Sequence, residues 1–540
     1  MFCSVSMGEL PVLFDEIVAQ KYFKNIIVSI RHFEFSETIV RSLRRFTALS
    51  ATIFASCLII AGCASTRGIA PRAKPVDASR LDASQAVRAA SVEAQWPNEQ
   101  WWKMYRDSQL DQWINDALAG SPTLEMARDR VRQAQAMASL ARADLAPELN
   151  GNLSMTRQHW PDNIFYGPGP LANTDTWNNT IGLSFSYNLD LWGHDEKAAE
   201  RALDAAHMQA VDARAAQLEL EANIVRTYVK LSLAFAQRDI AAQTLAHEQS
   251  IADIARRRLQ GGIGTQLAFT QAQAPLPQRE RQIAAFDEQI ELTRNQLAAL
   301  AGKGPGAGAA LRRPTLSLDT PVSMPSILPA ELLGHRPDVV AARWRVAAYA
   351  TGIDVARSAF YPNVNLLASV GGTFVGGGPL AFLLSQAHAA SAGPAVSLPI
   401  FNGGRLRAQL DAASAGYDLA VNQYNQTLIN ALKDIADQIV TLKSLDAQRE
   451  AMQRAVTVAQ RGYDLAASGF RRGLTDYLSV LSAQTQLLQA QQNAEVVHAS
   501  KLAARASLVA ALGGGLVDPH DGPPDDDPRV PKAIAQEASP

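Results

Sequence analysis

The segments Gly262–Gln273 (GIGTQLAFTQAQ) and Gly473–Gln484 (GLTDYLSVLSAQ) decide the fold, because they are two versions of one sequence. Aligned on their first glycines, they share a leucine five residues on and an Ala-Gln pair ten residues on. A second pair, Ala146–Asn150 (APELN) and Tyr361–Asn365 (YPNVN), recurs at nearly the same separation. Two matches at one long separation predict a duplicated supersecondary unit of roughly 180 residues with internal pseudo-symmetry.

The composition excludes several functional classes. The chain of 540 residues has a formal net charge of -2, so no surplus of basic residues points to nucleic acid as a partner. Its three cysteines, Cys3, Cys57 and Cys63, leave the rest of the chain without a disulfide framework or a thiolate metal site. The sequence contains no nucleophile elbow, HExxH, CxxC or Gly-Lys-Ser/Thr phosphate loop, and its histidines are scattered. We therefore predict no enzymatic activity, no cofactor and no metal site.

The amino-terminal region has the pattern of an export signal. A basic cluster, Arg41–Arg45, precedes the apolar stretch Phe46–Ala61, and the small residue Gly62 stands immediately before Cys63. This order is typical of secretory signals and resembles a bacterial lipoprotein signal, whose cysteine is acylated after cleavage. We predict a signal peptide over 40–62 and a covalent lipid on Cys63. The alternative is an apolar anchor that happens to contain a cysteine.

Each copy of the unit contains two segments in which polar and apolar residues alternate, as in a strand with one apolar and one wet face. The strands are expected at about 148–160 and 177–191, and again at about 363–374 and 395–401. In the second of these segments the apolar set is Trp177, Ile181, Leu183, Phe185, Tyr187, Leu189 and Leu191, and the polar set is Asn178, Thr180, Gly182, Ser184, Ser186, Asn188 and Asp190. Four strands cannot close a barrel, which needs about eight or more, so we expect several chains to build one barrel. A soluble sandwich is the alternative, but each hairpin is isolated between long helices.

Very long helices follow both hairpins. Uninterrupted helical patterns run from about 194 to 259 and from about 405 to 468, and each would span roughly 100 Å. Each ends at a glycine turn and returns as a shorter helix, which Pro275 and Pro277 should interrupt in the first copy. An aromatic-rich stretch, Trp96–Ile114, is expected to form a small helix that packs against these helices.

The predicted organisation is therefore mainly α-helical with a small β part. Its segments are 1–39, an extension ahead of the true translation start near Val40; 40–62, the signal peptide; 63–95, a linker; 96–302, the first repeat; 303–334, a linker; 335–515, the second repeat; and 516–540, a disordered tail.

Together, these features resemble the TolC-like outer-membrane efflux proteins, and within them the OprM/NodT-type lipoprotein exit ducts of RND drug pumps. The resemblance rests on Cys63, Trp101-Trp102, the duplication and the segment Gly473–Gln484. It implies a homotrimer whose twelve strands close one transmembrane barrel, continued by an α-helical barrel across the periplasm. It also implies passive conduction from an inner-membrane RND pump through a periplasmic membrane-fusion adaptor, with the chain lipid-anchored in the outer membrane.

The resemblance further assigns Gly262, Gly264 and Gly473 to the periplasmic tip turns. Family members often narrow the tip with rings of aspartate, but this sequence has Ser479 and Ser482 at those positions and Ala268 and Gln271 in the first copy. Asp476 is the carboxylate that remains near the second turn. Serine rings would neither repel one another nor attract cations, so we predict a gate closed by packing and hydrogen bonds.

Two other functions fit the same residues. The fold could serve protein export as the duct of a type I secretion system, although Cys63 and the Trp101-Trp102 segment weigh against it. A non-channel envelope scaffold built on coiled coils is the other alternative, and the alternating strands argue against it. The sequence does not identify the exported substrate.

Overall fold

The computed structural model describes residues 66–77, 81, 97–162, 170–317, 334–383, 385–516 and 522–523. These residues belong to one compact unit, Thr66–Pro540. The predicted extension, the signal peptide and Cys63 lie outside the described residues, as does nearly all of the predicted tail.

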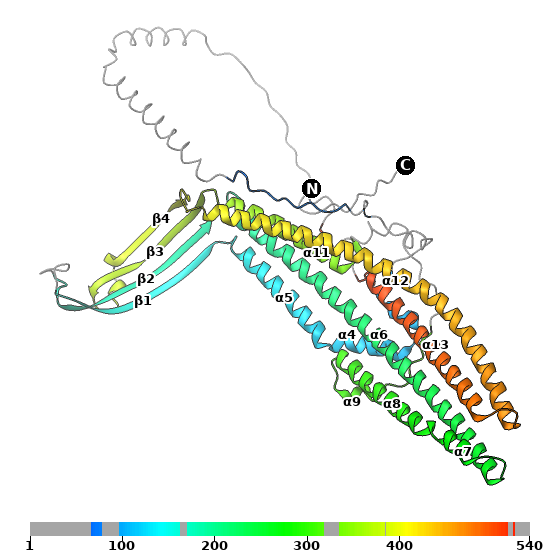
Figure 1. The fold of residues 1–540 in the computed structure, drawn as a ribbon. Coiled ribbons are helices and arrows are strands. Elements are labelled where there is room, and N and C mark those ends of the chain that lie inside the picture. The colour runs from blue at the N-terminus through cyan, green and yellow to red at the C-terminus, as the bar shows by residue number, and fades with distance from the viewer. Residues whose placement is uncertain are drawn as a thin grey trace, which may run out of the picture. The chain divides into compact units, whose positions relative to one another are not determined.

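Figure 1 labels the strands and the α-helices of the described residues. In chain order, the elements are the 3-10 helix η3 (Trp101–Tyr105), α4 (Ser108–Gly120), α5 (Pro122–Ala143), β1 (Glu148–Trp160), β2 (Thr174–Asn188), α6 (His194–Gln260), α7 (Gln266–Gln273), α8 (Pro275–Leu300), α9 (Pro305–Gly308), α11 (Pro337–Ser358), β3 (Asn363–Gly377), η4 (Ala381–Leu383), η5 (Ser385–Ala387), β4 (His388–Ser397), α12 (Arg405–Arg471) and α13 (Tyr477–Ala511). The order helix, two strands, long helix and returning helix occurs in both halves of the chain.

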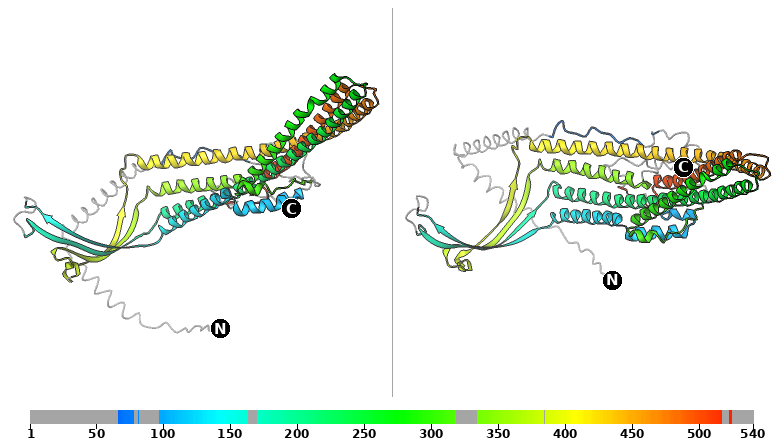
Figure 2. Two further views of the ribbon diagram at one scale, coloured as in Figure 1. Left: turned by 90° about the horizontal axis from the view of Figure 1, so that it is seen from below. Right: turned by 60° about the horizontal axis from the view of Figure 1, so that its bottom comes forward.

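The four strands form one antiparallel sheet in the order β1-β2-β3-β4. Figure 2 shows them as a single twisted sheet joined to the helices at one end. Strand β1 has the expected bounds, and β3 extends three residues beyond its expected end. The central pairing, in which Leu183 lies opposite Val370, joins the two halves of the chain.

Two predicted strand positions were wrong. Strand β2 ends at Asn188 rather than near 191, because Asp190 has a φ of 41°, a left-handed conformation that cannot continue a strand. Strand β4 covers His388–Ser397 instead of about 395–401. Its first residues are mostly alanine, serine and glycine, so they carry no hydrophobic period, and the apolar residues that suggested a later strand surround Pro399, which has no N–H to donate.

The long helices have the predicted character. Both α6 and α12 contain 67 residues and no proline, so no backbone hydrogen bond is interrupted within them. Helix α6 packs against α5, α8, α11 and α13, and α12 packs against α11 and α13. Apolar side chains of α12 that recur at three- and four-residue steps are buried, namely Val421, Tyr424, Leu428, Ala431 and Ile435. The break at the prolines is confirmed, since α7 ends at Gln273 and α8 begins at Pro275.

The aromatic stretch is part of the main core. Trp101, Trp102, Tyr105 and Trp113 are buried together with residues of α6, α8 and α13. The Tyr105 hydroxyl donates to the Leu502 carbonyl at 2.7 Å, and this contact ties the 3-10 helix to α13. The predicted small packing helix is therefore confirmed, as the 3-10 helix and α4.

Part of the predicted linker 63–95 is bound to the body. Backbone N–H groups of Arg72 and Ala73 both donate to one Asp418 carboxylate oxygen, each at 2.8 Å. The side-chain oxygen of Asn425 accepts from Val76 N, also at 2.8 Å. Residues 66–77 therefore form a strap along α12, held by side chains two turns apart on that helix.

Candidate functional site

The sheet has one apolar and one polar face across all four strands. The register places Leu149 beside Phe185, Phe185 beside Ala368, and Ala368 beside Ala392. The next position along each strand gives the row Asn150, Ser184, Ser369 and Ser391, in which the two serine hydroxyls are hydrogen-bonded at 2.8 Å. The register therefore continues the alternation seen in the sequence across all four strands in these two rows, with exceptions elsewhere such as Leu367, which lies beside Ser186 on the polar face.

Large side chains of the apolar face are exposed in the single chain. Leu149, Leu153, Leu183, Val370 and Val396 are each more than half exposed. Strands β1 and β4 each have a partner on one side, so both edges of the sheet are open. Exposed apolar side chains beside unpaired edges mark a surface that needs a partner.

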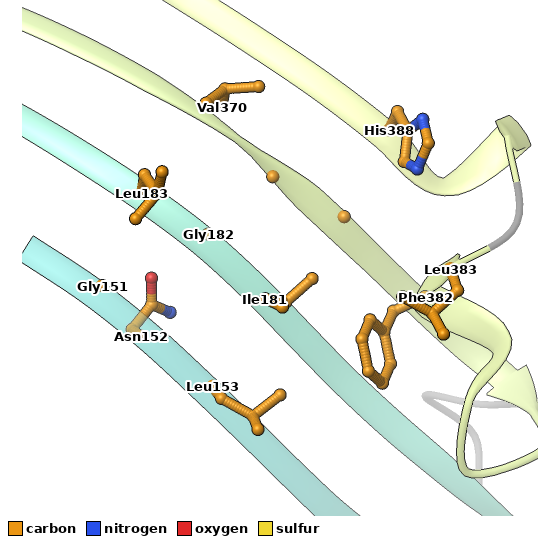
Figure 3. Close-up of a pocket in the computed structure, with 12 residues that line it drawn as sticks. Gly151, Asn152, Leu153, Ile181, Gly182, Leu183, Val370, Phe382, Leu383 and His388 are labelled. Carbon is orange, nitrogen blue, oxygen red and sulfur yellow. The ribbon is translucent and has the colours of Figure 1, made fainter.

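A cavity of about 670 Å³ lies on this apolar face (Figure 3). Ile181, Leu183 and Val370 line it from the strands, and Phe382 covers it from the connection between β3 and β4. Gly372 permits this closure, because a Cβ there would lie 2.5 Å from the Phe382 carbonyl oxygen. Most of the wall is apolar, and Asn152 and His388 are its polar side chains.

The two predicted tip turns have the same construction. Gly262 and Gly473 have φ of 73° and 79°, which favours glycine at both turns. Gly264 has a different constraint, since a Cβ there would lie 2.9 Å from the backbone of Arg258. The three predicted tip glycines are therefore each required by the local backbone.

Each turn is followed by a capped helix. The Thr265 hydroxyl accepts from Ala268 N at 3.1 Å at the start of α7. Asp476 occupies the aligned position before α13 and accepts from both Ser479 N at 2.9 Å and the Ser479 hydroxyl at 2.6 Å. The hydrogen bonds from Ser479 lower the pKa of Asp476. The remaining carboxylate near the second turn thus caps a helix, with one oxygen engaged by Ser479.

The predicted constriction residues lie in the first turns of these helices. Ser479 and Ser482 are exposed on α13, whereas Ala268 and Gln271 are half-buried on α7. Neither serine is covered within the protomer, so both remain available to another chain.

Sequence reasoning missed the side chain that links the two turns. Arg258, near the end of α6, donates through Nη1 to the Phe470 carbonyl oxygen at 3.3 Å, and its guanidinium lies 5.2 Å from the centre of the Phe470 ring. A Cβ at Gly473 would lie 3.2 Å from Arg258 Nη2. The sequence did contain the run Arg256-Arg257-Arg258 just before the turn. Which of these side chains points toward α12 depends on how the helices pack, and the run does not show it.

Farther along the same helices a buried ion pair was also missed. Arg279 Nη2 of α8 lies 3.1 Å from Glu248 Oε1 of α6, and the two side chains are 15% and 2% exposed. On the neighbouring α13, Gln484 donates to the Thr244 carbonyl at 3.3 Å. These contacts join α6 to both returning helices.

Two buried carboxylates fix the region near the aromatic stretch. Asp107 accepts from Gln109 N and Leu110 N at the start of α4, and from Thr315 N at 2.7 Å and the Tyr228 hydroxyl at 3.1 Å. Glu221 accepts from Trp101 Nε1 at 3.0 Å, and burial raises the pKa of Glu221 to about 7. Both carboxylates have structural partners and neither faces a catalytic partner.

Within the parts of the chain that the structure covers, no cluster of histidine, cysteine and acidic side chains could hold a metal ion. Among the same residues, none of the helices is both long enough and apolar enough to span a membrane.

A family model described as outer membrane efflux protein matches residues 113–303 and 328–514. The fusaric acid resistance protein FusA of Burkholderia cepacia is 58% identical over 68% of this chain and 69% of its own length. The pyoverdine export outer membrane protein OpmQ of Pseudomonas aeruginosa is 30% identical over 87% of this chain and 98% of its own length.

Solved structures agree with these matches. The outer membrane protein VceC from Vibrio cholerae superposes with a TM-score of 0.72 at 32% identity and covers 78% of this chain and 100% of its own. The channel protein CusC superposes with a TM-score of 0.72 at 26% identity, over 83% of this chain and 99% of its own. With a family model that matches most of its length and relatives similar across both halves, the chain belongs to the outer membrane efflux protein family.

Proposed function

We propose that this protein is the outer-membrane exit duct of a tripartite RND-type efflux system and conducts drugs or other toxic small molecules passively out of the cell. The observation that carries the proposal is the four-stranded sheet, with one apolar face, one polar face and two open edges. Three copies joined edge to edge would give twelve strands and leave no edge unpaired. The apolar face would then contact lipid and the polar face would line water.

The helices support the same proposal. Helices α6 and α12, at about 1.5 Å per residue, are each roughly 100 Å long, and side-by-side packing of three copies would continue the barrel across the periplasm. The two tip turns would face the membrane-fusion adaptor and the inner-membrane pump. Conduction needs no energy source in this chain, because the pump would supply it.

The proposed gate is formed by Ser479 and Ser482, with Ala268, Gln271 and Asp476 nearby. In a trimer each exposed serine would form a ring of three uncharged hydroxyls. Such a gate would close by packing and hydrogen bonding, and it would bind divalent cations weakly.

The proposed anchor is a lipid on Cys63, with residues 1–39 absent from the mature protein and outer-membrane lipid as the partner. The strap supports it from the body side, because Arg72, Ala73 and Val76, a few residues after Cys63, are hydrogen-bonded to α12. Mass spectrometry of the mature protein would test it: an acylated Cys63 at the amino terminus is expected, and an unmodified Cys63 or peptides from 1–39 would contradict it.

Cross-linking tests the assembly of the barrel. All three native cysteines precede residue 64, so the body offers a cysteine-free background. With Asn152→Cys fixed on β1, cysteines placed singly at Ala389, Ser391 and Gly393 on β4 should trap covalent trimers at one register. The same β4 cysteines paired with Asn178→Cys on the central strand β2 serve as the control. Monomers from every β1–β4 pair would contradict edge-to-edge closure.

A further inference from the structure

Two adjoining cavities lie where the sheet meets the helices. One, of about 420 Å³, is lined by Asn188, Asn363 and Ser397 from the ends of the strands. The other, of about 430 Å³, lies between α6, α11 and α12, and both include His194 and Ala359 in their walls. Each volume is within the range of small-molecule sites.

The register places the first of these cavities on the polar side of the sheet. Asn363 lies opposite Ser397, and Asn188 lies opposite Asn365, which is on the same face as Asn363. All three strand residues that line the first cavity therefore belong to the polar face. If the polar face lines the duct, the first cavity faces its lumen, and the helical cavity adjoins the first at His194 and Ala359.

The helical cavity, called here the junction recess, has one charged side chain and no carboxylate in its wall. Arg201 of α6 is exposed there, and Tyr349 and Gln409 face it from α11 and α12. Among the residues that the structure describes, Arg201 has neither a hydrogen-bonded nor an ion-paired partner. The basic side chain one turn earlier, Lys197, pairs with Glu200 at 2.6 Å.

The nearby acidic groups are already engaged. Asp190 accepts from His194 N at 2.6 Å and from Glu196 N at 2.8 Å, and so caps α6. Asp195 accepts from Asn188 Nδ2 at 2.5 Å. Both carboxylates line the neighbouring cavity and not the junction recess.

Two glycines make room for the side chains of Arg201 and Tyr349. A Cβ at Gly352 would lie 3.5 Å from Arg201 Cζ, so the guanidinium lies directly against the backbone of α11. A Cβ at Gly416 would lie 3.0 Å from two carbons of the Tyr349 ring, which rests on the backbone of α12 in the same way. A planar cation and an aromatic ring therefore lie in one recess. The rest of its wall combines small apolar residues, such as Ala356 and Ala412, with the polar side chains of His194 and Gln409.

From this arrangement we infer that the junction recess is a cargo-binding site for small planar aromatic carboxylates. Arg201 would bind the carboxylate through its paired N–H groups, and Tyr349 would stack on the ring. The site would be transient, because a duct must release what it binds. The inference rests on the proposed function, since only a conducting trimer makes the polar face a lumen.

The test is calorimetric binding to the full mature protein in lipid nanodiscs, with empty nanodiscs subtracted. Quinoline-2-carboxylate is the probe, and quinoline-2-carboxamide is the matched ligand without charge. Wild type should bind the carboxylate about tenfold more tightly than the carboxamide, as one charged hydrogen-bonded pair implies. Arg201→Gln should remove this preference. Tyr349→Leu should lower the affinity for both ligands by a similar factor.

Arg357→Gln is the control, because Arg357 pairs with Asp354 on α11 and does not line the recess. It should keep the wild-type preference. The inference is overturned if wild type does not distinguish the two ligands, if Arg201→Gln keeps the preference, or if Arg357→Gln loses it equally. Single-channel recording, with a variant that lacks both tip hairpins beside the same samples, separates the two claims. A protein that conducts without arginine-dependent binding refutes the site alone, whereas silence that persists in the hairpin-deleted variant refutes the proposed function.

Discussion

Replacing Arg258 by glutamine should favour the open state of the tip. Arg258 is the side chain that joins the end of α6 to the end of α12, through a 3.3 Å hydrogen bond to the Phe470 carbonyl and a guanidinium 5.2 Å from the Phe470 ring. Opening the tip would separate these two turns and break both contacts. The substitution therefore removes two contacts that join the turns in this structure and that separation of the turns would break.

The size of the effect follows from the two contacts. A long hydrogen bond from a half-buried guanidinium contributes about 1 kcal/mol, and a partly exposed cation–π contact contributes about 0.5–1 kcal/mol. Their loss should raise the open-to-closed ratio about tenfold to thirtyfold, since each 1.4 kcal/mol is a factor of ten. Single-channel recording of open probability in a planar bilayer measures that ratio directly.

Arg256→Gln is the matched control, because Arg256 pairs with Asp253 at 3.0 Å on the surface of α6 and does not reach α12. It should leave the open probability unchanged. Phe470→Leu should raise the open probability by part of the Arg258→Gln effect. Because both variants remove the same cation–π contact, the double variant should change the opening free energy by less than the sum of the two single changes. An open probability that is unchanged by Arg258→Gln, or raised equally by Arg256→Gln, would refute the reasoning.

Three further predictions concern other sites. Asp107→Ala should destabilise the protein by about 2–4 kcal/mol, because it leaves two buried donors without an acceptor and uncaps α4; a thermal unfolding midpoint equal to wild type would contradict this. The pKa of Glu221 is raised from 4.5 to about 7, so the folded protein holds this proton more tightly than the unfolded chain. The free energy of unfolding should therefore fall by about 3 kcal/mol as the pH rises from 4.5 to 7. Glu221→Gln should abolish that fall. Melting curves of wild type and variant at pH 5 and pH 8 test this, and a variant as sensitive to pH as wild type would contradict the role given to Glu221. Ser479→Asp with Ser482→Asp should create block by divalent cations that wild type lacks, and equally strong block of wild type in bilayer recordings would count against the serine gate.

The regular parts of the fold could be predicted because their signals are local. Strand β1 alternates from Leu149 to Met155. Helices α6 and α12 contain no proline, so their helical period and their helix propensity agree. Strand β4 was misplaced because small residues such as Ala389, Ala390 and Ser391 fit a strand without marking either of its faces. Its position is set by pairing with β3, which no local pattern contains.

The candidate site could be predicted only where the backbone itself required a residue. Turns at Gly262 and Gly473 could be predicted because glycine ends both long helical patterns, and their left-handed φ accounts for glycine there. Their place at the periplasmic tip comes from the family resemblance and stays a prediction. Arg258 and Arg201 were missed because their roles depend on which helix lies opposite, and each resembles an ordinary exposed arginine on a helix. The strap was assigned to a linker for the same reason, since Asp418 and Asn425 lie about 350 residues along the chain from the backbone groups that they bind.

The most direct test of the central claim is single-channel conductance of the purified mature protein in a planar lipid bilayer. The account predicts discrete openings of one size from trimers, and larger or more frequent openings when the tip is loosened by Arg258→Gln. A protein that stays silent in wild type, in Arg258→Gln and in a variant with both tip hairpins deleted would contradict the claim that it is a channel.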